Sequence, residues 1–241
     1  MSLNLWQGRL VGMVSKHLET LDIDFACIQE DVQSTGRFPT FTTSSKTSKS
    51  LRLPYVYFSQ ILNIKICGKD FIFGNGTYSK NESAESSTIF TRGSYIADYI
   101  EGEDDYNVRA FEHTVYEIGG KKLNIINHHG HHINEHKLGN DETMRQMSQI
   151  HDYAKVLDGA IIICGDFNLE PESRSIQLLD QSFRNLSVEH ELKTTRSLLT
   201  TKKEVCDYIF VNDQVTVNKF YMDETIVSDH NGLVLDFDLK A

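Results

Sequence analysis

The chain has 241 residues, 39% of them hydrophobic and 24% charged, a composition typical of one soluble globular domain with a large core. Its apolar runs are about as long as a strand, far short of the roughly 20 residues that a membrane-spanning helix needs, and we expect neither a membrane anchor nor a signal peptide. The 34 acidic residues outnumber the 24 basic ones. The net charge of −10 argues against a protein that grips long nucleic acid through many phosphate contacts, but it allows a local contact with one phosphate.

The four cysteines form no Cys-x-x-Cys pair, and three of them lie in apolar runs, where a free thiol behaves as a small core side chain. We therefore expect reduced, buried cysteines and a cytoplasmic setting, in preference to disulfides or a metal site. The four are Cys27, Cys67, Cys164 and Cys206.

The predicted elements begin with a strand at residues 3–6 and a helix whose apolar positions recur at helical spacing from Leu10 to Leu21. A buried strand at residues 25–28 follows and ends in the polar cluster Gln29-Glu30-Asp31, and strand ends of this kind are where sites are built. Residues 34–50 contain ten Ser or Thr, three basic residues and no acidic one. This segment indicates an irregular loop, either on the surface or facing a phosphate.

Strands dominate the rest of the chain. We predict them at residues 71–73, 87–90, 94–99, 108–118, 121–129, 160–164, 205–211, 215–221 and 232–239. Two helices are predicted, one capped by Asn140 or Asp141 and ended by Gly159, the other at residues 172–179. In the last strand, apolar side chains occupy every second position from Leu233 to Leu239, so only one face is fully apolar. This pattern favours two sheets packed face to face with helices outside, and no linker divides the chain.

Five of the ten histidines lie between Asn127 and His136, as in a metal cluster. Because side chains alternate along a strand, Asn127 and His129 share a face and His128 lies on the other. A zinc site needs three or four converging ligands, and the sequence does not show that His131, His132 and His136 converge. A zinc hydrolase built on residues 128–136 stays open as an alternative.

Polar residues also follow the buried strand at residues 160–164. The two-residue period places Asp166 and Asn168 side by side, and because burial of an unpaired carboxylate is costly, we expect them to face a cleft that holds a cation or a water nucleophile. The alternative is a turn in which both side chains cap the backbone. Near the C-terminus, adjacent residues of an extended chain face apart, so we expect Asp207, rather than Asp229, to be the partner of His230 unless the chain turns there.

Taken in order, these motifs resemble the endonuclease/exonuclease/phosphatase superfamily, which has the DNase-I-like fold. The resemblance runs from residue 3 to the final strand, and the ordered set is far more specific than any single string. It implies an α/β (α+β) four-layer sandwich, a single domain over residues 1–241, and hydrolysis of a phosphate ester with a divalent cation, usually Mg²⁺ and alternatively Mn²⁺. The motifs are Asn4 in Leu3-Asn4-Leu5-Trp6, Ile28-Gln29-Glu30, Asn127-His128-His129-Gly130, Gly165-Asp166-Phe167-Asn168, Asp207-Tyr208-Ile209 and Ser228-Asp229-His230.

The resemblance also assigns a metal side to the site. It implies that Glu30 is the main metal ligand, with Asn4 beside it and Asp229 assisting. It implies that Asp166 and Asn168 position the attacking water and the scissile phosphate.

The other assignments concern the histidines and the substrate. By the same resemblance, His230 is oriented by Asp207 and acts as a base or stabilises the phosphate charge, while His129 assists the leaving oxygen. We expect Asn127, in the same motif as His129, to bind substrate together with Asn168. Arg196 belongs to a basic stretch that either holds a substrate phosphate or is a solvated loop; the others are Lys193, Lys202 and Lys203.

Phosphate chemistry fits these roles. A phosphodiester resists hydrolysis because its negative oxygens repel the nucleophile, and a hard cation held by carboxylate and amide oxygens neutralises that charge. A positioned acid or base adds only about 10²- to 10⁴-fold, so the metal carries a major share. We expect a hydrolase that acts on nucleic-acid ends, short or single-stranded nucleic acid, or small phosphodiesters. The alternatives are a phosphoinositide or sphingomyelin-type enzyme and a non-catalytic binding module on the same fold. No protein partner can be inferred from the sequence.

Overall fold

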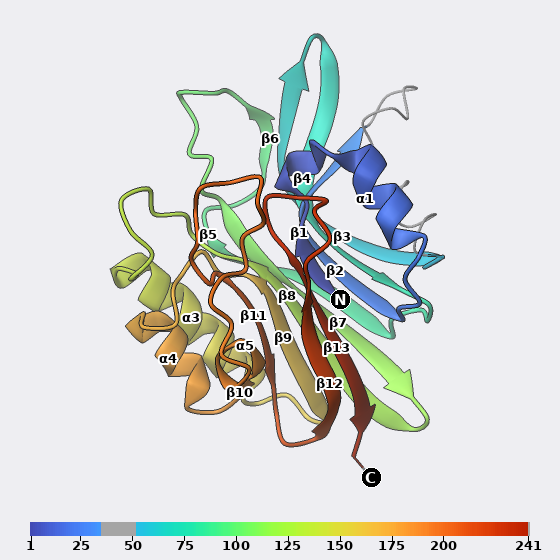
Figure 1. The fold of residues 1–241 in the computed structure, drawn as a ribbon. Coiled ribbons are helices and arrows are strands. Elements are labelled where there is room, and N and C mark those ends of the chain that lie inside the picture. The colour runs from blue at the N-terminus through green and yellow to red at the C-terminus, as the bar shows by residue number, and fades with distance from the viewer. Residues whose placement is uncertain (35–51, 241) are drawn as a thin grey trace.

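The computed structural model describes residues 1–34 and 52–240, and within these two ranges the strands form two mixed sheets (Figure 1). The first sheet consists of β1 (Ser2–Asn4), β2 (Phe25–Ser34), β3 (Tyr55–Ile66), β4 (Lys69–Ser79), β6 (Ile96–Tyr99), β12 (Val215–Asp223) and β13 (Gly232–Leu239). The second consists of β5 (Glu85–Arg92), β7 (Arg109–Ile118), β8 (Lys121–His129), β9 (Ala160–Asp166), β10 (Arg184–Asn185) and β11 (Asp207–Val211). Their spatial orders are β12-β13-β1-β2-β4-β3-β6 and β10-β11-β9-β8-β7-β5.

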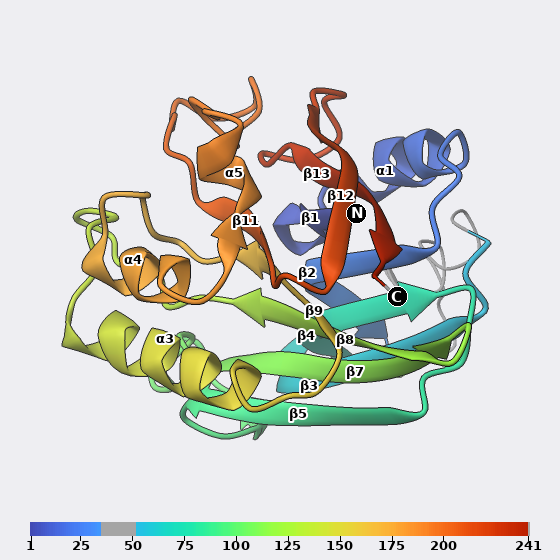
Figure 2. The same cartoon turned by 90° about the horizontal axis from the view of Figure 1, so that it is seen from below.

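Helices cover the two outer faces of this pair of sheets (Figure 2). Helix α1 (Val11–Leu18) packs on the first sheet, while α3 (Asp141–Ala154) and α4 (Arg174–Asp180) pack on the second; a short 3-10 helix η1 (Trp6–Gly8) and α5 (Leu186–Glu189) complete the described helices. The chain therefore has the expected four-layer sandwich. No helix within the described residues is long and apolar enough to cross a membrane.

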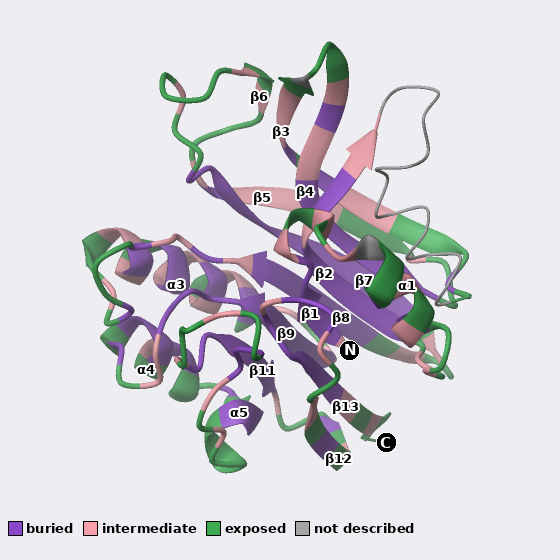
Figure 3. Cartoon of the chain, turned by 45° about the horizontal axis from the view of Figure 1, so that its top comes forward, coloured by how far each residue is buried: buried purple, intermediate pink, exposed green. Residues whose placement is uncertain are grey.

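Three apolar clusters hold the layers together. One joins α3 and α4 to the outer face of the second sheet and includes Met147 and Ile163. Another fills the space between the sheets and includes Leu123 and Leu233, and the third lies under α1. Each fully buried Leu, Ile or Met contributes about 1.5 to 3 kcal/mol relative to an exposed one. Figure 3 shows that the central strands are buried along most of their length, which makes them a rigid support for a site at their ends.

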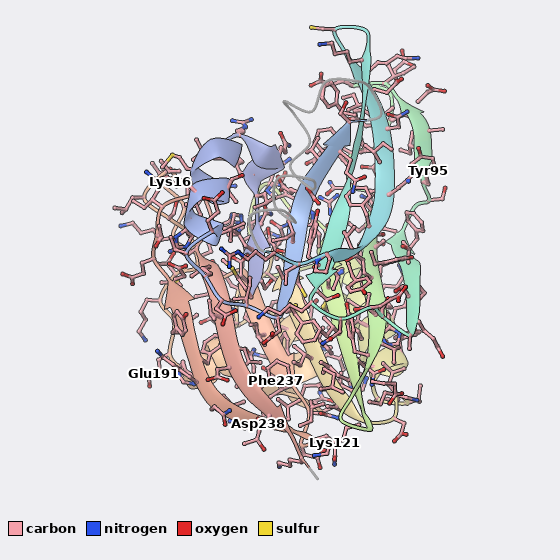
Figure 4. The ribbon with its side chains drawn as sticks, turned by 90° about the vertical axis from the view of Figure 1, so that its right-hand side faces the viewer. Lys16, Tyr95, Lys121, Glu191, Phe237 and Asp238 are labelled. Carbon is pink, nitrogen blue, oxygen red and sulfur yellow. The ribbon has the colours of Figure 1, made fainter. Side chains whose placement is uncertain are left out.

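Most elements lie where the sequence predicts them. Asn140 caps α3: its Oδ1 accepts a hydrogen bond from the Thr143 amide at 3.0 Å, and the Thr143 hydroxyl accepts one from the Asn140 amide at 2.8 Å. In β13 the alternation holds, because Phe237 packs against the core between the sheets while Asp238 is exposed (Figure 4). Helix α3 ends at Ala154, earlier than the expected end at Gly159.

The β3–β4 hairpin differs from expectation. The sequence analysis predicts no strand at residues 55–66 and only three residues of β4, because exposed Tyr55 and Val56 and the glycines of β4 obscure the alternation. In the structure a Cβ atom on Gly74 would lie 1.8 Å from the carbonyl oxygen of Ser59, so this glycine allows the two strands to approach rather than forming a turn. The predicted loop at residues 34–50 lies, apart from Ser34, outside the described residues.

A polar network crosses the buried space between the sheets. Asn127 is fully buried there: its Oδ1 accepts from Gln29 Nε2 at 2.7 Å, and its Nδ2 donates to Glu112 Oε2 at 3.1 Å. The same Glu112 carboxylate accepts from the Ser59 amide at 2.8 Å and the Thr77 hydroxyl at 2.7 Å. Burial raises the pKa of Glu112 to about 8, although these hydrogen bonds oppose the shift.

Glu112 makes the stability of the fold dependent on pH. The folded state keeps the Glu112 proton up to about pH 8, whereas the unfolded chain loses it near the ordinary value of 4.5, so stability falls as pH rises between these values. We expect urea unfolding to show wild-type stability lower at about pH 9 than at about pH 6 by on the order of 3 kcal/mol, with a smaller difference in Glu112→Gln. Exposed Glu117→Gln is the control. A pH dependence unaltered by Glu112→Gln would contradict this explanation.

Candidate active site

Strand ends from both sheets meet at one end of the sandwich, around a cavity of about 740 Å³. Asn4 ends β1, His129 ends β8, Asp166 ends β9 and Asp207 begins β11. Residues that are distant in the sequence therefore lie together because the sheet order places β1 beside β2 and β9 between β8 and β11. The predicted residues that line the cavity are Glu30, His129, Asp166, Asn168, Arg196, Asp229 and His230.

Glu30 lies at a bulge in β2. The pairing with β4 shifts between Ile28 and Asp31, so that Gln29 and Glu30 oppose Asn75 alone. Glu30 itself has a positive φ of 53°, a conformation that a non-glycine residue adopts at some cost. The bulge turns the Glu30 carboxylate toward the cavity, where its side chain is 24% exposed, while the flanking residues remain buried.

Asn4 joins Glu30 to Asp166. Its Nδ2 donates to Glu30 Oε1 at 3.2 Å and to Asp166 Oδ2 at 3.0 Å, while its Oδ1 accepts from the Trp6 amide at 2.9 Å. The carbonyl of Asn4 in turn accepts from the Ser228 hydroxyl at 2.7 Å, which ties β1 to the segment before β13. The amide of Asn4 thus holds two carboxylates side by side.

Asp166 and Asn168 form a turn and also face the cavity, so the two alternatives of the sequence analysis, a capping turn and a position at a cleft, are both present. The Asn168 amide nitrogen donates to Asp166 Oδ1 at 2.8 Å, as in a turn, and both residues line the cavity. Asn168 has a positive φ of 57°, and its side chain is fixed at both ends, Oδ1 by Lys137 Nζ at 3.1 Å and Nδ2 by the Gly130 carbonyl at 3.3 Å. A Cβ atom on Gly130 would lie 2.2 Å from the Phe167 carbonyl oxygen, so only glycine allows this approach.

His230 pairs with Asp207. Its Nδ1 lies 2.9 Å from Asp207 Oδ2, and that oxygen also accepts from the Thr195 hydroxyl at 2.6 Å. Its Nε2 faces Asp166 Oδ2 at 3.6 Å. Burial alone would lower the pKa of His230, but the carboxylates of Asp207 and Asp166 raise it above its ordinary value.

The chain bends at residues 228–229, so Asp229 and His230 both reach the cavity, where an extended chain would separate them. Arg196 lies between these elements: its Nη1 contacts His230 Nε2 and is 4.0 Å from Asp229 Oδ2. Burial would raise the pKa of Asp166, but the positive charges of His230 and Arg196 lower it below its ordinary value, which keeps this carboxylate ionised.

His129 Nε2 lies between two carboxylates, 3.8 Å from Glu30 Oε1 and 4.0 Å from Asp166 Oδ2. Burial and then the nearby Arg109 lower the pKa of His129 well below its ordinary value, so the imidazole is neutral. Asn127, from the same motif, does not line the cavity. It lies between the sheets, where Gln29 and Glu112 occupy its amide, and this position does not fit direct contact with a substrate.

Arg109 is a cavity residue that the sequence analysis does not identify. Its guanidinium is bound by neutral oxygens, including the Gly130 carbonyl at 2.6 Å and Asn107 Oδ1 at 2.9 Å. Burial lowers the pKa of Arg109, opposed by the nearby Glu30 and Asp166, and no carboxylate within the described residues forms an ion pair with it. Its charge therefore remains available to an anion in the cavity. An arginine inside an ordinary strand gives no sequence signal of this role.

The histidines of residues 128–136 do not converge. Burial lowers the pKa of His128 to about 3, and this ring packs edge-on against Phe167, away from the cavity. In the described part of the chain, one group of three His, Cys, Asp or Glu side chains has its ligand atoms within 4.8 Å of one another, and it consists of Asp166, Asp207 and His230. The structure therefore gives no support to zinc at residues 128–136.

The donor set fits a hard divalent cation. Burial raises the pKa of Glu30, opposed by the Asn4 hydrogen bond and by His230, while Asp166 and Asp229 raise it further. The neutral His129 ring lies beside Glu30, and within the described residues no cationic side chain contacts the Glu30 carboxylate directly. Carboxylate oxygens gathered in this way are the ligands that Mg²⁺ takes, together with water. In the alternative group, Asp207 is already occupied by His230 and Thr195.

Comparison with known proteins agrees with this geometry. The sequence profile described as the Endonuclease/Exonuclease/phosphatase family matches residues 1–230. No curated protein sequence matches the chain.

Solved structures share the fold. An endonuclease/exonuclease/phosphatase family protein from Leptotrichia buccalis C-1013-b aligns with a TM-score of 0.73 at 15% identity, covering 99% of this chain and 98% of that one. A mannosyl-6-phosphatase from Bacteroides thetaiotaomicron aligns with a TM-score of 0.67 at 14% identity, covering 99% and 98%. D. rerio TDP2, complexed with a single-stranded DNA product, aligns with a TM-score of 0.70 at 15% identity, covering 98% and 97%.

The Asp207–His230 pair can be tested without turnover. Because the Asp207 carboxylate favours the protonated imidazole, Asp207→Asn should lower the midpoint of the His230 titration measured by NMR. Asp223→Asn is the matched control, since it breaks a second His–Asp pair, His17 with Asp223, and should leave His230 unchanged. An unaltered His230 midpoint in Asp207→Asn would contradict the pairing.

Proposed function

Because the chain belongs to the Endonuclease/Exonuclease/phosphatase family, we propose that it is a Mg²⁺-dependent hydrolase of phosphate esters. We propose a phosphodiesterase or nuclease that acts on nucleic-acid ends or small phosphodiesters. The observation that supports this proposal is that two carboxylates able to bind a cation, Glu30 and Asp166, lie at the same cavity as His230 of the Asp207–His230 pair.

Glu30 is the proposed main metal ligand, with Asp166 and Asp229 close by and Asn4 holding the carboxylates in place. Asn4 presents its Nδ2 to them, so a ligand role for its Oδ1 would require the amide to turn. Bound Mg²⁺ supplies positive charge that neutralises phosphate oxygens and favours attack by water. Mn²⁺ has similar ligand preferences and is the expected substitute.

Ionised Asp166 and the fixed Asn168 amide are proposed to orient the attacking water and the phosphate. Asp166 is suited to accept a hydrogen bond from water because the surrounding cations keep it unprotonated. The Asn168 side chain is held by Lys137 and Gly130, which limits its motion to a single orientation toward the cavity. Such preorganisation lowers the cost of assembling the reacting groups.

His230 and Arg196 supply positive charge beside Asp166. The Asp207 carboxylate accepts from Nδ1 of His230 and leaves Nε2 directed at the cavity, which suits either proton transfer or stabilisation of phosphate oxygens. Buried Arg196 is proposed to bind a phosphate oxygen. Neutral His129, between Glu30 and Asp166, is placed to hydrogen-bond the leaving oxygen.

We also propose a reducing, cytoplasmic setting. The support is that the four cysteines are free thiols and that Cys27, Cys164 and Cys206 are buried as small core side chains, while Cys67 is exposed.

Replacement of Glu30 tests the mechanism. Glu30→Ala should reduce kcat/KM for bis(p-nitrophenyl) phosphate with Mg²⁺ by at least the factor seen in His230→Ala, on the order of 10² to 10⁴. Exposed Glu82→Ala should leave the rate unchanged. Calorimetric titration with Mg²⁺ should lose its binding signal in Glu30→Ala. Unchanged turnover in that variant would remove the proposed mechanism, and Mg²⁺-independent binding of substrate without turnover would favour a non-catalytic module.

A substrate panel tests the specificity. Single- and double-stranded DNA, RNA, inositol phosphates and sphingomyelin, each assayed with Mg²⁺ and with EDTA, distinguish the candidates. We expect EDTA to abolish activity and short nucleic-acid ends or small diesters to react faster than long duplexes. Faster turnover of inositol phosphates or sphingomyelin would contradict nucleic-acid ends and small phosphodiesters as the substrates.

A further inference from the structure

The cavity has an apolar wall opposite its polar end. Strands β3, β4 and β6 and the segment before β7 supply this wall, whereas Glu30, His129 and Asp166 come from the central strands. Its side chains are Leu62, Ile64, Phe73, Tyr99, Tyr106 and Val108. None of these residues has a place in the hydrolytic chemistry, so the wall calls for a different explanation.

The wall is anchored to the body of the protein. Ile61, Val108 and Ala110 form a small buried cluster against which Phe90 and Ile96 pack. Leu62 pairs with Ile96 across β3 and β6. Tyr106, by contrast, is 48% exposed, although it lines the cavity. An apolar surface that packs on a buried cluster and carries the exposed ring of Tyr106 is suited to bind an apolar group.

The cavity is also larger than a phosphate group requires. Pockets of about 300 to 1,000 Å³ accommodate drug-sized organic ligands, and this cavity measures about 740 Å³. In the proposed reaction the phosphate lies at the polar end, beside His230 and Arg196. The remaining space lies against the wall and fits an organic group esterified to that phosphate.

The charge around the wall disfavours a polyanion. Glu101 and Asp104 line the cavity on this side, in the segment Glu101-Gly102-Glu103-Asp104-Asp105, which has no basic residue. The basic residues that line the cavity are Arg109, Arg196 and Lys202, and the first two lie against the reacting groups. A nucleic-acid chain that ran along the wall would bring phosphates near carboxylates within about one Debye length, roughly 8 Å.

We propose that the wall binds the organic group of the substrate and that the site prefers phosphate esters of uncharged aromatic or branched apolar alcohols over esters that continue as a nucleic-acid chain. This inference rests on the proposed function and specifies its substrate. In the reaction, the water oxygen bonds to phosphorus, the bond from phosphorus to the alcohol oxygen breaks, and the alcohol leaves with one proton of that water.

Ligand binding without turnover provides the first test. With Mg²⁺ present, calorimetry should show that phenylphosphonate binds at least about fivefold more tightly than methylphosphonate. Tyr106→Ser should remove most of this preference. Tyr95→Ser is the matched control, because Tyr95 is 40% exposed at the edge of the molecule and does not line the cavity (Figure 4). The inference would be overturned if the two phosphonates bound equally well or if neither bound. Equal effects of Tyr106→Ser and Tyr95→Ser would also overturn it.

Kinetics provide the second test. Wild type should hydrolyse bis(p-nitrophenyl) phosphate with a KM at least about tenfold below that for a thymidine trinucleotide, which carries a second phosphate beyond the scissile one. Charge reversal by Glu101→Lys with Asp104→Lys should lower the trinucleotide KM about fivefold or more, whereas Glu103→Lys, outside the cavity, should not. A trinucleotide KM equal to or below that of the aryl diester would overturn the inference. Hydrolysis of neither diester would instead count against the proposed function, and the phosphonate comparison would still decide the role of the wall.

Discussion

The site depends on an electrostatic balance among carboxylates that are wholly or partly removed from water. Buried Asp166 and Asp207 and partly buried Glu30 and Asp229 lie at one end of the sandwich, and a buried carboxylate without compensation is costly. The protein compensates unevenly. Asp207 pairs with His230, and Asp166 lies close to His230 and Arg196. The described direct contacts of Glu30 are the Asn4 amide and the neutral His129 ring, and His230 acts on it from further away. A divalent cation, as proposed above, would relieve this imbalance.

The fold provides this balance through deviations from regular structure. The strands alone would turn alternate residues into the core, but the bulge at Glu30 and the left-handed backbone at Asn168 redirect side chains that the strand period places elsewhere. The bend before His230 has the same effect. These local costs are sustained because the apolar clusters on both faces of each sheet fix the strands on either side.

Most of the regular strands and helices could be predicted from the sequence, whereas the local deviations that shape the site could not. Regular features, such as the alternation of β13 and the cap of α3, are local and were predictable. The fold class and the set of converging residues required the ordered motifs, because no local pattern shows that Asn4 lies beside Asp166. What escaped prediction depends on tertiary contact: Arg109 looks like any strand residue, β3 has exposed apolar residues and a bulge, and Asn127 points between the sheets, although it shares a strand face with His129.

Asn127 also suggests how the two sheets keep the site in register. It contacts Gln29, the residue before Glu30, and its own strand ends two residues later in His129. The Gln29–Asn127 hydrogen bond therefore fixes the strand that delivers the carboxylate relative to the strand that delivers the imidazole. An apolar pair at these positions would pack without a preferred register, since apolar contacts are not directional, whereas an amide pair has one geometry. The buried polar network thus fixes β2 relative to β8, and with these strands the positions of Glu30 and His129.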